Sequence, residues 1–154
     1  MIVGEKVRAP FWDEPTGAMF RHGYTYSGHA AACAAGMANL DIIEREGLVQ
    51  RVADLAPVLA ARVGSLADHP LVGEIRAAGL LAAVEFDDEV LRADPGIVDR
   101  AVVTARRHGI LTRNLRARAL QISPPFVITE AQIDLLTDGL RTTLTELAGD
   151  GAAR

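Results

Sequence analysis

The residues best suited to chemistry near the start of the chain are a short run of glycines, hydroxyl side chains and aromatic rings. Residues 22–29 read His-Gly-Tyr-Thr-Tyr-Ser-Gly-His and stand directly before an alanine-rich segment. Thr25 and Ser27 offer hydroxyls, and Gly23 and Gly28 let the backbone approach a bound group closely. Because a helix N-terminus favours negative charge, this run is suited to hold a phosphate or another anion. The alternative is a turn and a helix cap with no ligand.

A second group of candidates is basic and lies in the C-terminal half. Arg113, Arg116 and Arg118 stand in a short segment between two apolar runs. A guanidinium has a planar fork that donates two parallel hydrogen bonds, which suits it to bind a carboxylate. Arg113 is the first candidate, and Arg116 and Arg118 compete with it. The alternative is a solvated arginine at the end of a strand.

Helices are predicted to follow the first of these motifs. Residues 28–46 are rich in alanine, which favours a helix, and Gly47 is expected to end it. Residues 48–66 repeat leucine and valine at three- and four-residue steps, which predicts a second helix. Pro57 is expected to kink or break that helix. Cys33, the single cysteine, is expected to be a small buried apolar residue.

The pattern of the residues after Pro70 predicts a compact α/β unit. The expected order is β-β-α-β-β-α, with helices on one side of a small sheet. Thr129 and Gln132 are spaced as a capping box at the start of the last helix. The expected strands cover residues 72–77, 80–86, 110–113 and 119–123, with one helix from about residue 95 to 108 and another from residue 129 onward.

Composition excludes several classes of function. The 154 residues carry 16 Lys and Arg against 20 Asp and Glu, a formal net charge of −4, so we expect no nucleic-acid partner. Charged residues interrupt every apolar stretch, so no membrane span is expected. The first residues lack the pattern of a signal peptide, so a cytoplasmic location is expected. The four histidines and one cysteine do not show metal-ligand spacing, and no metal site is predicted.

The motifs together resemble a known family. Residues 22–29, residues 110–113 and residues 120–129, which read Leu-Gln-Ile-Ser-Pro-Pro-Phe-Val-Ile-Thr, resemble the C-terminal part of the class III aminotransferases in order and spacing. These are fold-type-I enzymes that use pyridoxal 5′-phosphate. The first motif resembles the branch that uses amines and ω-amino acids. The resemblance implies that residues 1–27 end the large domain and carry the cofactor-phosphate loop. Residues 28–70 are then linking helices, and residues 71–154 form the small C-terminal α/β domain.

The resemblance also implies roles for four residues. Thr25, with Tyr24 and Ser27 beside it, contacts the cofactor phosphate in the active site of the other subunit of a homodimer. Arg113 binds the carboxylate of the substrate. The enzyme moves an amino group from an amine or ω-amino acid donor to a keto-acid acceptor.

One essential residue of the family has no counterpart in this sequence. The Schiff-base lysine of the family lies a few dozen residues before the position of Thr25, which is upstream of Met1. Lys6, the only lysine, falls at an ordinary surface position of a helix. No residue is therefore assigned as catalytic, and the chain alone is expected to be inactive. The alternatives are a non-catalytic interaction or dimerisation fragment, which docks through the helix over residues 28–46, and a gene remnant.

Overall fold

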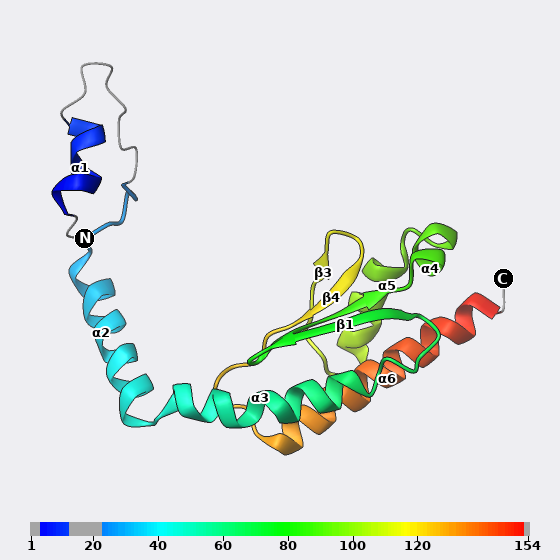
Figure 1. Cartoon of the computed structure of the whole chain (residues 1–154). Coiled ribbons are helices and arrows are strands. Elements are labelled where there is room, and N and C mark those ends of the chain that lie inside the picture. Colours follow the sequence, from blue (N-terminus) through cyan, green and yellow to red (C-terminus); the bar gives the residue numbers. More distant parts are fainter. Residues whose placement is uncertain (1–3, 13–22, 153–154) are drawn as a thin grey trace. The chain divides into compact units, whose positions relative to one another are not determined.

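A computed structural model describes residues 4–12 and 23–152, and the chain divides into two compact units (Figure 1). The first unit is Met1–Asp41 and the second is Ile42–Arg154. None of the described residues of the first unit is buried, whereas the second unit holds the hydrophobic core. The second unit therefore supplies the packing that stabilises the structure.

The first unit contains helix α1 (Glu5–Trp12) and most of helix α2 (Ala30–Arg45). α2 confirms the helix predicted over residues 28–46, and Gly47, with φ +59°, follows its end as expected. Cys33 lies on α2 and is exposed, so the prediction of a buried cysteine is wrong. The physical reason is that no residue of α2 is buried, so the small side chains of this helix, Cys33 included, stay open to solvent.

Helix α3 (Leu48–Gly64) opens the second unit and confirms the periodicity of its leucines and valines. The helix is continuous through Pro57, so the predicted break does not occur. Leu55 and Leu59 are buried on either side of the proline, and this packing holds both halves in one helix. Tertiary contacts thus outweigh the hydrogen bond that proline cannot donate.

Four antiparallel strands form one sheet in the order β1-β2-β4-β3. β1 (Val72–Ala78) and β2 (Leu81–Phe86) form the predicted hairpin, and Gly79 takes the left-handed conformation that its turn requires. β4 (Ala119–Ile122) pairs with β2 and also confirms its prediction.

The third predicted strand is displaced along the chain. β3 covers only Asn114–Leu115, so the prediction of a strand over residues 110–113 is wrong. The regular ladder is interrupted there because the Thr112 hydroxyl donates to the Gln121 carbonyl at 2.7 Å. A short helix α4 (Asp88–Ala93), which the sequence analysis missed, begins after Asp87, whose side chain accepts from the Glu89 N–H.

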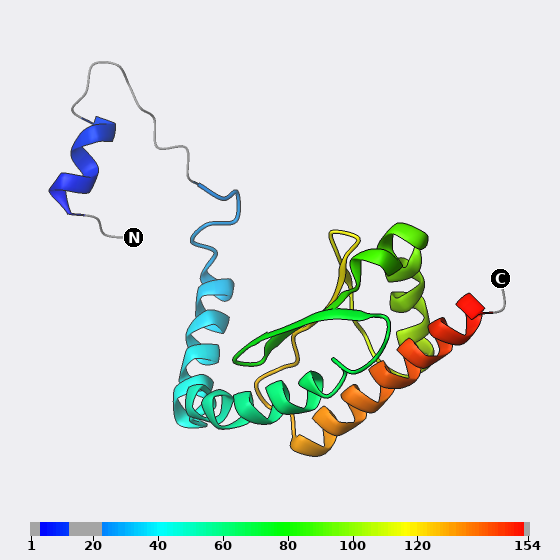
Figure 2. The same ribbon diagram turned by 45° about the vertical axis from the view of Figure 1, so that its right-hand side comes forward.

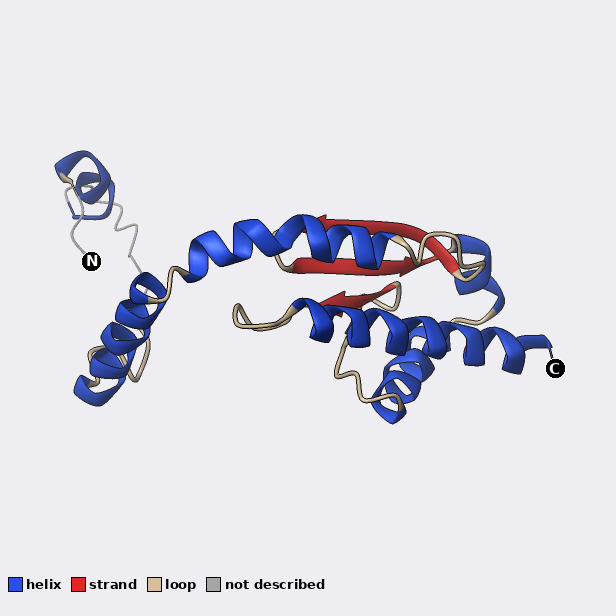
Figure 3. Ribbon diagram, turned by 90° about the horizontal axis from the view of Figure 1, so that it is seen from below, coloured by secondary structure: helices blue, strands red, loops and turns tan. Residues whose placement is uncertain are grey.

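Helices cover one face of the sheet, as predicted for the unit after residue 70, and α3, which was expected to be a linking helix, lies on the same face. α3 contacts β1 and β2, α5 (Ile97–Arg107) contacts β3 and β4, and α6 (Glu130–Ala152) packs beside α3 and α5 (Figure 1, Figure 2). Figure 3 shows α3 and α6 on the same side of the strands. Strand side chains alternate accordingly. The side chains buried on the helix-covered face include Ala82, Val84 and Phe86 of β2 and Leu120 and Ile122 of β4.

Helix α6 begins with the predicted capping box. The Thr129 N–H donates to the Gln132 side chain at 2.9 Å, and the Gln132 N–H donates to the Thr129 hydroxyl at 3.3 Å. These two bonds satisfy backbone donors that a helix start leaves open. Neither α6, at 23 residues, nor any other helix in the described part of the chain has the length and apolar character to span a membrane.

Candidate functional site

The predicted phosphate loop is a tight turn that leads into α2. The Ser27 N–H donates to the Tyr24 carbonyl at 2.9 Å, and the Tyr24 N–H donates to the Ser27 hydroxyl at 3.1 Å. Gly28 follows with φ +73°. His29 then caps the helix, because its Nδ1 accepts from the Ala32 N–H at 3.3 Å. His22, the first residue of the motif, lies outside the described residues.

The chemistry of this turn fits the phosphate end of a cofactor. Thr25 is exposed, and within residues 4–12 and 23–152 its hydroxyl takes part in no hydrogen bond. The Ser27 hydroxyl accepts one bond from the backbone and keeps its own proton to donate. The start of α2 adds a favourable field for an anion. The cofactor role of Tyr24, Thr25 and Ser27 stays a prediction.

Arg113 lies at a pocket of about 590 Å³ in the second unit. Three segments line this pocket, which we call the proline-loop pocket: the stretch after α5, the stretch from β4 through the two prolines, and the first turns of α6. They are residues 109–113, residues 121–125 with Ile128, and Gln132, Leu135 and Leu136. Pro124 and Pro125 both line the pocket.

Arg113 and Gln121 face each other across the end of the sheet. The Gln121 N–H donates to the Arg113 carbonyl at 3.1 Å, and the Arg113 Nε donates to the Gln121 Oε1 at 2.6 Å. The Gln121 Nε2 in turn donates to the Ser123 hydroxyl at 3.1 Å. Both ends of the Gln121 amide are therefore engaged, and the Arg113 side chain is held by a neutral partner.

A second pocket, of about 460 Å³, lies on the sheet face that the helices leave open. Arg113 and Gln121 line it together with residues of the β1–β2 hairpin, including Arg76 and Leu81, and with Leu115 of β3. The pair thus borders both pockets.

The competing arginines have other surroundings. Arg118 is ion-paired to Glu85 at 3.0 Å and to Asp88 at 2.5 Å. Arg116 sits in the tight turn between β3 and β4 with φ +54°, and it lines neither of these pockets. Arg113 makes no ion pair within the described part of the chain, so its charge is not neutralised by a carboxylate there. The geometry therefore favours Arg113 among the three, and its binding role stays a prediction.

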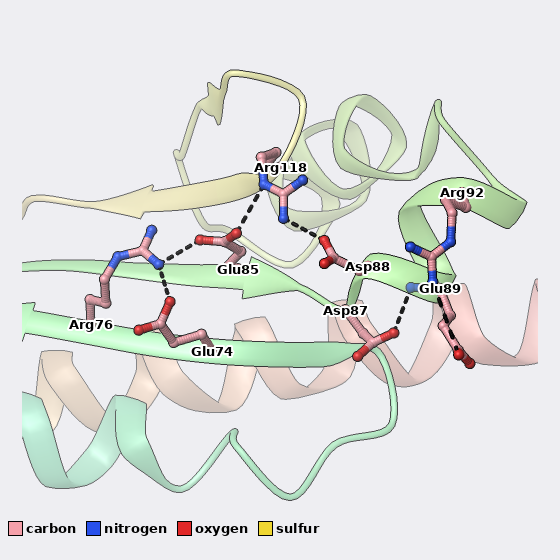
Figure 4. Close-up of polar contacts among 8 residues, drawn as sticks. All are labelled: Glu74, Arg76, Glu85, Asp87, Asp88, Glu89, Arg92 and Arg118. Carbon is pink, nitrogen blue, oxygen red and sulfur yellow. Dashed lines mark hydrogen bonds and ion pairs between the residues drawn. The ribbon is translucent and has the colours of Figure 1, made fainter.

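A chain of ion pairs crosses the open face of the sheet beside the second pocket (Figure 4). Arg76 joins Glu74 and Glu85, and Arg118 joins Glu85 and Asp88. The hydrogen bond from Arg76, with help from Arg118, lowers the pKa of Glu85 below its ordinary value. Arg118 lowers the pKa of Asp88 in the same way. Both carboxylates stay ionised to a lower pH than free ones.

Replacing Glu85 by glutamine is expected to lower the melting temperature at pH 7 by about 2–5 °C, because two arginines lose their shared partner. A carboxyl whose pKa is lowered on folding stabilises the protein above the unfolded pKa, and this contribution is lost as the pH falls through the folded value. The difference between Glu85→Gln and the unaltered protein should therefore shrink below about pH 4. Melting curves from pH 3 to 8 measure it, and a difference constant over this range contradicts the assignment.

Two residues were missed from the sequence: Gln121, which contacts Arg113, and Gly139, which lies against Ile110 of the same pocket lining. Gln121 is a polar residue inside the apolar strand β4, and this break in the pattern was the signal that could have marked it. Gly139 lies in α6, where an added Cβ would stand 2.7 Å from Ile110 Cγ1 and 3.3 Å from the His108 carbonyl oxygen. No local sequence signal indicates that contact, because the two segments are far apart along the chain.

Comparison with known proteins defines the class to which this fold and loop belong. The family model described as Aminotransferase class-III matches residues 7–144. The chain belongs to the class III aminotransferases, as its resemblance indicated.

Individual relatives support the same class. The diaminobutyrate–2-oxoglutarate transaminase of Halomonas elongata is 41% identical over 120 residues, which are 73% of this chain and 26% of that protein. The putrescine–pyruvate aminotransferase of Pseudomonas aeruginosa is 39% identical over 137 residues, 86% of this chain and 30% of that protein. A solved ω-transferase from Vibrio fluvialis JS17 matches with a TM-score of 0.77 and 31% identity, covering 88% of this chain and 33% of that one.

The chain is much shorter than these relatives. It spans between 26% and 33% of their length. The α/β fold described above is therefore part of the transaminase fold, and the small antiparallel sheet with its helices is confirmed as such by the structural match.

Proposed function

We propose that the chain supplies the C-terminal part of a pyridoxal-phosphate-dependent aminotransferase that moves an amino group from an amine or ω-amino acid to a keto acid. The observation that carries the proposal is the family match over residues 7–144. Relatives described as a putrescine–pyruvate aminotransferase and an ω-transferase support the amine-using branch. A homodimer that shares its sites between subunits, and a cytoplasmic location, belong to the same proposal.

The residues of the chain would bind two groups in that reaction, the phosphate of the cofactor and the carboxylate of the substrate. Pyridoxal phosphate, when bound, supplies the aldehyde chemistry that takes up and returns the amino group. Thr25 and Ser27, with Tyr24 beside them, hold its phosphate at the start of α2, where hydroxyls and the helix field favour an anion. Arg113 binds and orients the substrate carboxylate through the planar fork of its guanidinium. Lys6, exposed on α1, takes no part.

The chain alone is expected to be inactive, which a simple assay tests. Purified chain with added pyridoxal phosphate, putrescine and pyruvate should form no more alanine than a protein-free blank, because the proposal assigns it no cofactor-holding lysine. Lys6→Ala should behave identically. Turnover by the chain that disappears in Lys6→Ala contradicts the proposed division of roles.

Sequencing the DNA upstream of the Met1 codon is a second test of the proposal. An in-frame reading frame that encodes a lysine a few dozen residues before Thr25 supports a complete enzyme. In that longer protein, Thr25→Ala should weaken pyridoxal phosphate binding by at least about tenfold, as expected for a lost hydrogen bond to a charged group. An in-frame stop codon close to Met1 favours the second candidate function.

The second candidate is a non-catalytic interaction fragment, and the exposure of α2 favours it. Met37 is 60% exposed and Leu40 is 57% exposed, although both are large apolar side chains. Such a helix gains stability when a partner covers it. Size-exclusion chromatography that shows a discrete dimer unable to bind pyridoxal phosphate supports this candidate, and a monomer that binds the cofactor contradicts it. An aggregated product is the result expected of a gene remnant.

A further inference from the structure

The arginines on and beside the open face of the sheet differ in one respect. Arg76 and Arg118 are each neutralised by two carboxylates, Glu85 being common to both. Arg113 borders the same face, and its side-chain partner is the neutral amide of Gln121. Arg76 and Arg118 are therefore paired with carboxylates, whereas Arg113 is paired with an uncharged amide.

The contact uses only one edge of the guanidinium. The bond to Gln121 is made by the Arg113 Nε, and no described residue accepts a hydrogen bond from either Nη group. An arginine fork binds a carboxylate with two parallel N–H groups. The contact thus fixes the direction of the side chain while the Nη groups stay available to a ligand.

Gln121 is itself fixed from three directions. Its N–H donates to the Arg113 carbonyl, its own carbonyl accepts from the Thr112 hydroxyl, and its Nε2 donates to the Ser123 hydroxyl at 3.1 Å. The bond to Ser123 also orients the amide, because it directs the oxygen toward Arg113. Gln121 is half-buried, so this arrangement is built into the end of the sheet.

We infer that Gln121 is a positioning residue that aims Arg113 between the two pockets and keeps its positive charge free for a substrate carboxylate. This inference rests on the proposed function of Arg113. A glutamate at position 121 would instead neutralise the guanidinium, as Glu85 does for Arg76 and Arg118. An apolar side chain of equal length would keep the charge but lose the direction.

Nuclear magnetic resonance of the arginine side chains in the 154-residue chain tests the inference with acetate as the probe. The Arg113 Nε–Hε signal, identified by its loss in Arg113→Lys, is followed during titration with sodium acetate at constant ionic strength. The unaltered chain should show a saturable shift. Gln121→Glu should weaken acetate binding by at least about fivefold, because a tethered carboxylate competes for the same group. Gln121→Met should weaken it by about two- to fivefold and speed the exchange of Hε with water.

Gln132→Glu is the matched control. Gln132 lines the same pocket, and glutamate is equally suited to the capping box, so this variant adds the same charge without touching Arg113. Its acetate affinity should stay within about twofold of the unaltered chain, because the residue 132 side chain is solvent-exposed and accepts from the Thr129 N–H, so its charge is not held against the guanidinium. Equal weakening in Gln132→Glu and Gln121→Glu overturns the inference, since the effect then reflects pocket charge alone.

The outcomes separate the inference from the proposed function. If acetate shifts the Arg113 signal but both Gln121 variants bind it as the unaltered chain does, the role of Gln121 is wrong and that of Arg113 stands. If acetate moves no Arg113 signal in the unaltered chain, the carboxylate role of Arg113 fails and the inference fails with it. Melting temperatures within about 3 °C of the unaltered chain, as expected for partly exposed substitutions, show that a change in affinity is not a loss of fold.

Discussion

Replacing Phe86 by alanine is expected to lower the free energy of unfolding by about 3–5 kcal/mol, the usual cost of removing a buried aromatic ring. Phe86 is 1% exposed and ends β2 on the face that the helices cover. The loss is a large share of the roughly 5–15 kcal/mol that stabilises a typical domain. Urea unfolding followed by circular dichroism measures it as a lower midpoint.

A second variant on the same strand provides the control. Leu81 is 52% exposed at the start of β2, on the open face of the sheet. Leu81→Ala should therefore cost about 1 kcal/mol or less. Equal losses from the two variants contradict the assignment of the core to one face. Because β2 pairs with β4, the Phe86 variant should also broaden the Arg113 side-chain signal, and the Leu81 variant should not.

The parts of the fold that the sequence predicted correctly depend on local chemistry. The β1–β2 hairpin needs a residue in the left-handed conformation at its turn, and the glycine at position 79 indicates such a turn in the sequence. The start of α6 depends on two side chains three residues apart, and both predicted hydrogen bonds of the capping box are present. In these cases the residues that carry the signal are also the residues that make the contact.

The wrong predictions concern residues whose structure depends on distant contacts. Pro57 does not break α3, because buried leucines on either side hold the helix to the core. β3 starts at Asn114, because Thr112 uses its side chain to reach Gln121. Cys33 is exposed on α2, which has no buried residue. An alanine-rich composition predicts the helix, but it does not predict which of its side chains are buried. The periodicity of the sequence does not reveal which distant residues pack around Pro57, bond to Thr112 or leave Cys33 exposed.

The candidate site shows the same division. The sequence indicated an anion-binding loop or a turn with a helix cap at residues 22–29, and the turn over residues 24–27 is present, because glycine and hydroxyl residues before a helix are a local pattern. The sequence also put Arg113 first in the basic segment, through the family resemblance, but the residue pattern alone left Arg116 and Arg118 as competitors. That choice depends on Glu85 and Asp88, which lie on other elements and neutralise Arg118. Gln121, the partner of Arg113, likewise depends on cross-strand pairing.

Replacing Gly139 by alanine should destabilise the protein by about 1–3 kcal/mol, although alanine is the better helix former. An added Cβ would stand 2.7 Å and 2.9 Å from the Cγ1 and Cδ1 of Ile110, and 3.3 Å from the His108 carbonyl oxygen. The side chain of Ile110 must move to make room for the added methyl group. The methyl group cannot shift away freely, because the His108 carbonyl oxygen is also close to it. The clash therefore exceeds the gain in helix propensity, which is about 1 kcal/mol.

Gly149→Ala is the matched control, because it lies on the same helix α6 and its added Cβ meets nothing within 4 Å. This variant should stabilise the protein slightly or leave it unchanged. Ile110 lines the proline-loop pocket three residues before Arg113, so Gly139→Ala should also shift the Arg113 side-chain signal and weaken acetate binding. Gly149→Ala should do neither. If both alanine variants raise the unfolding midpoint, the close approach of α6 to Ile110 does not exist in solution, and the pocket beside Arg113 must be formed differently.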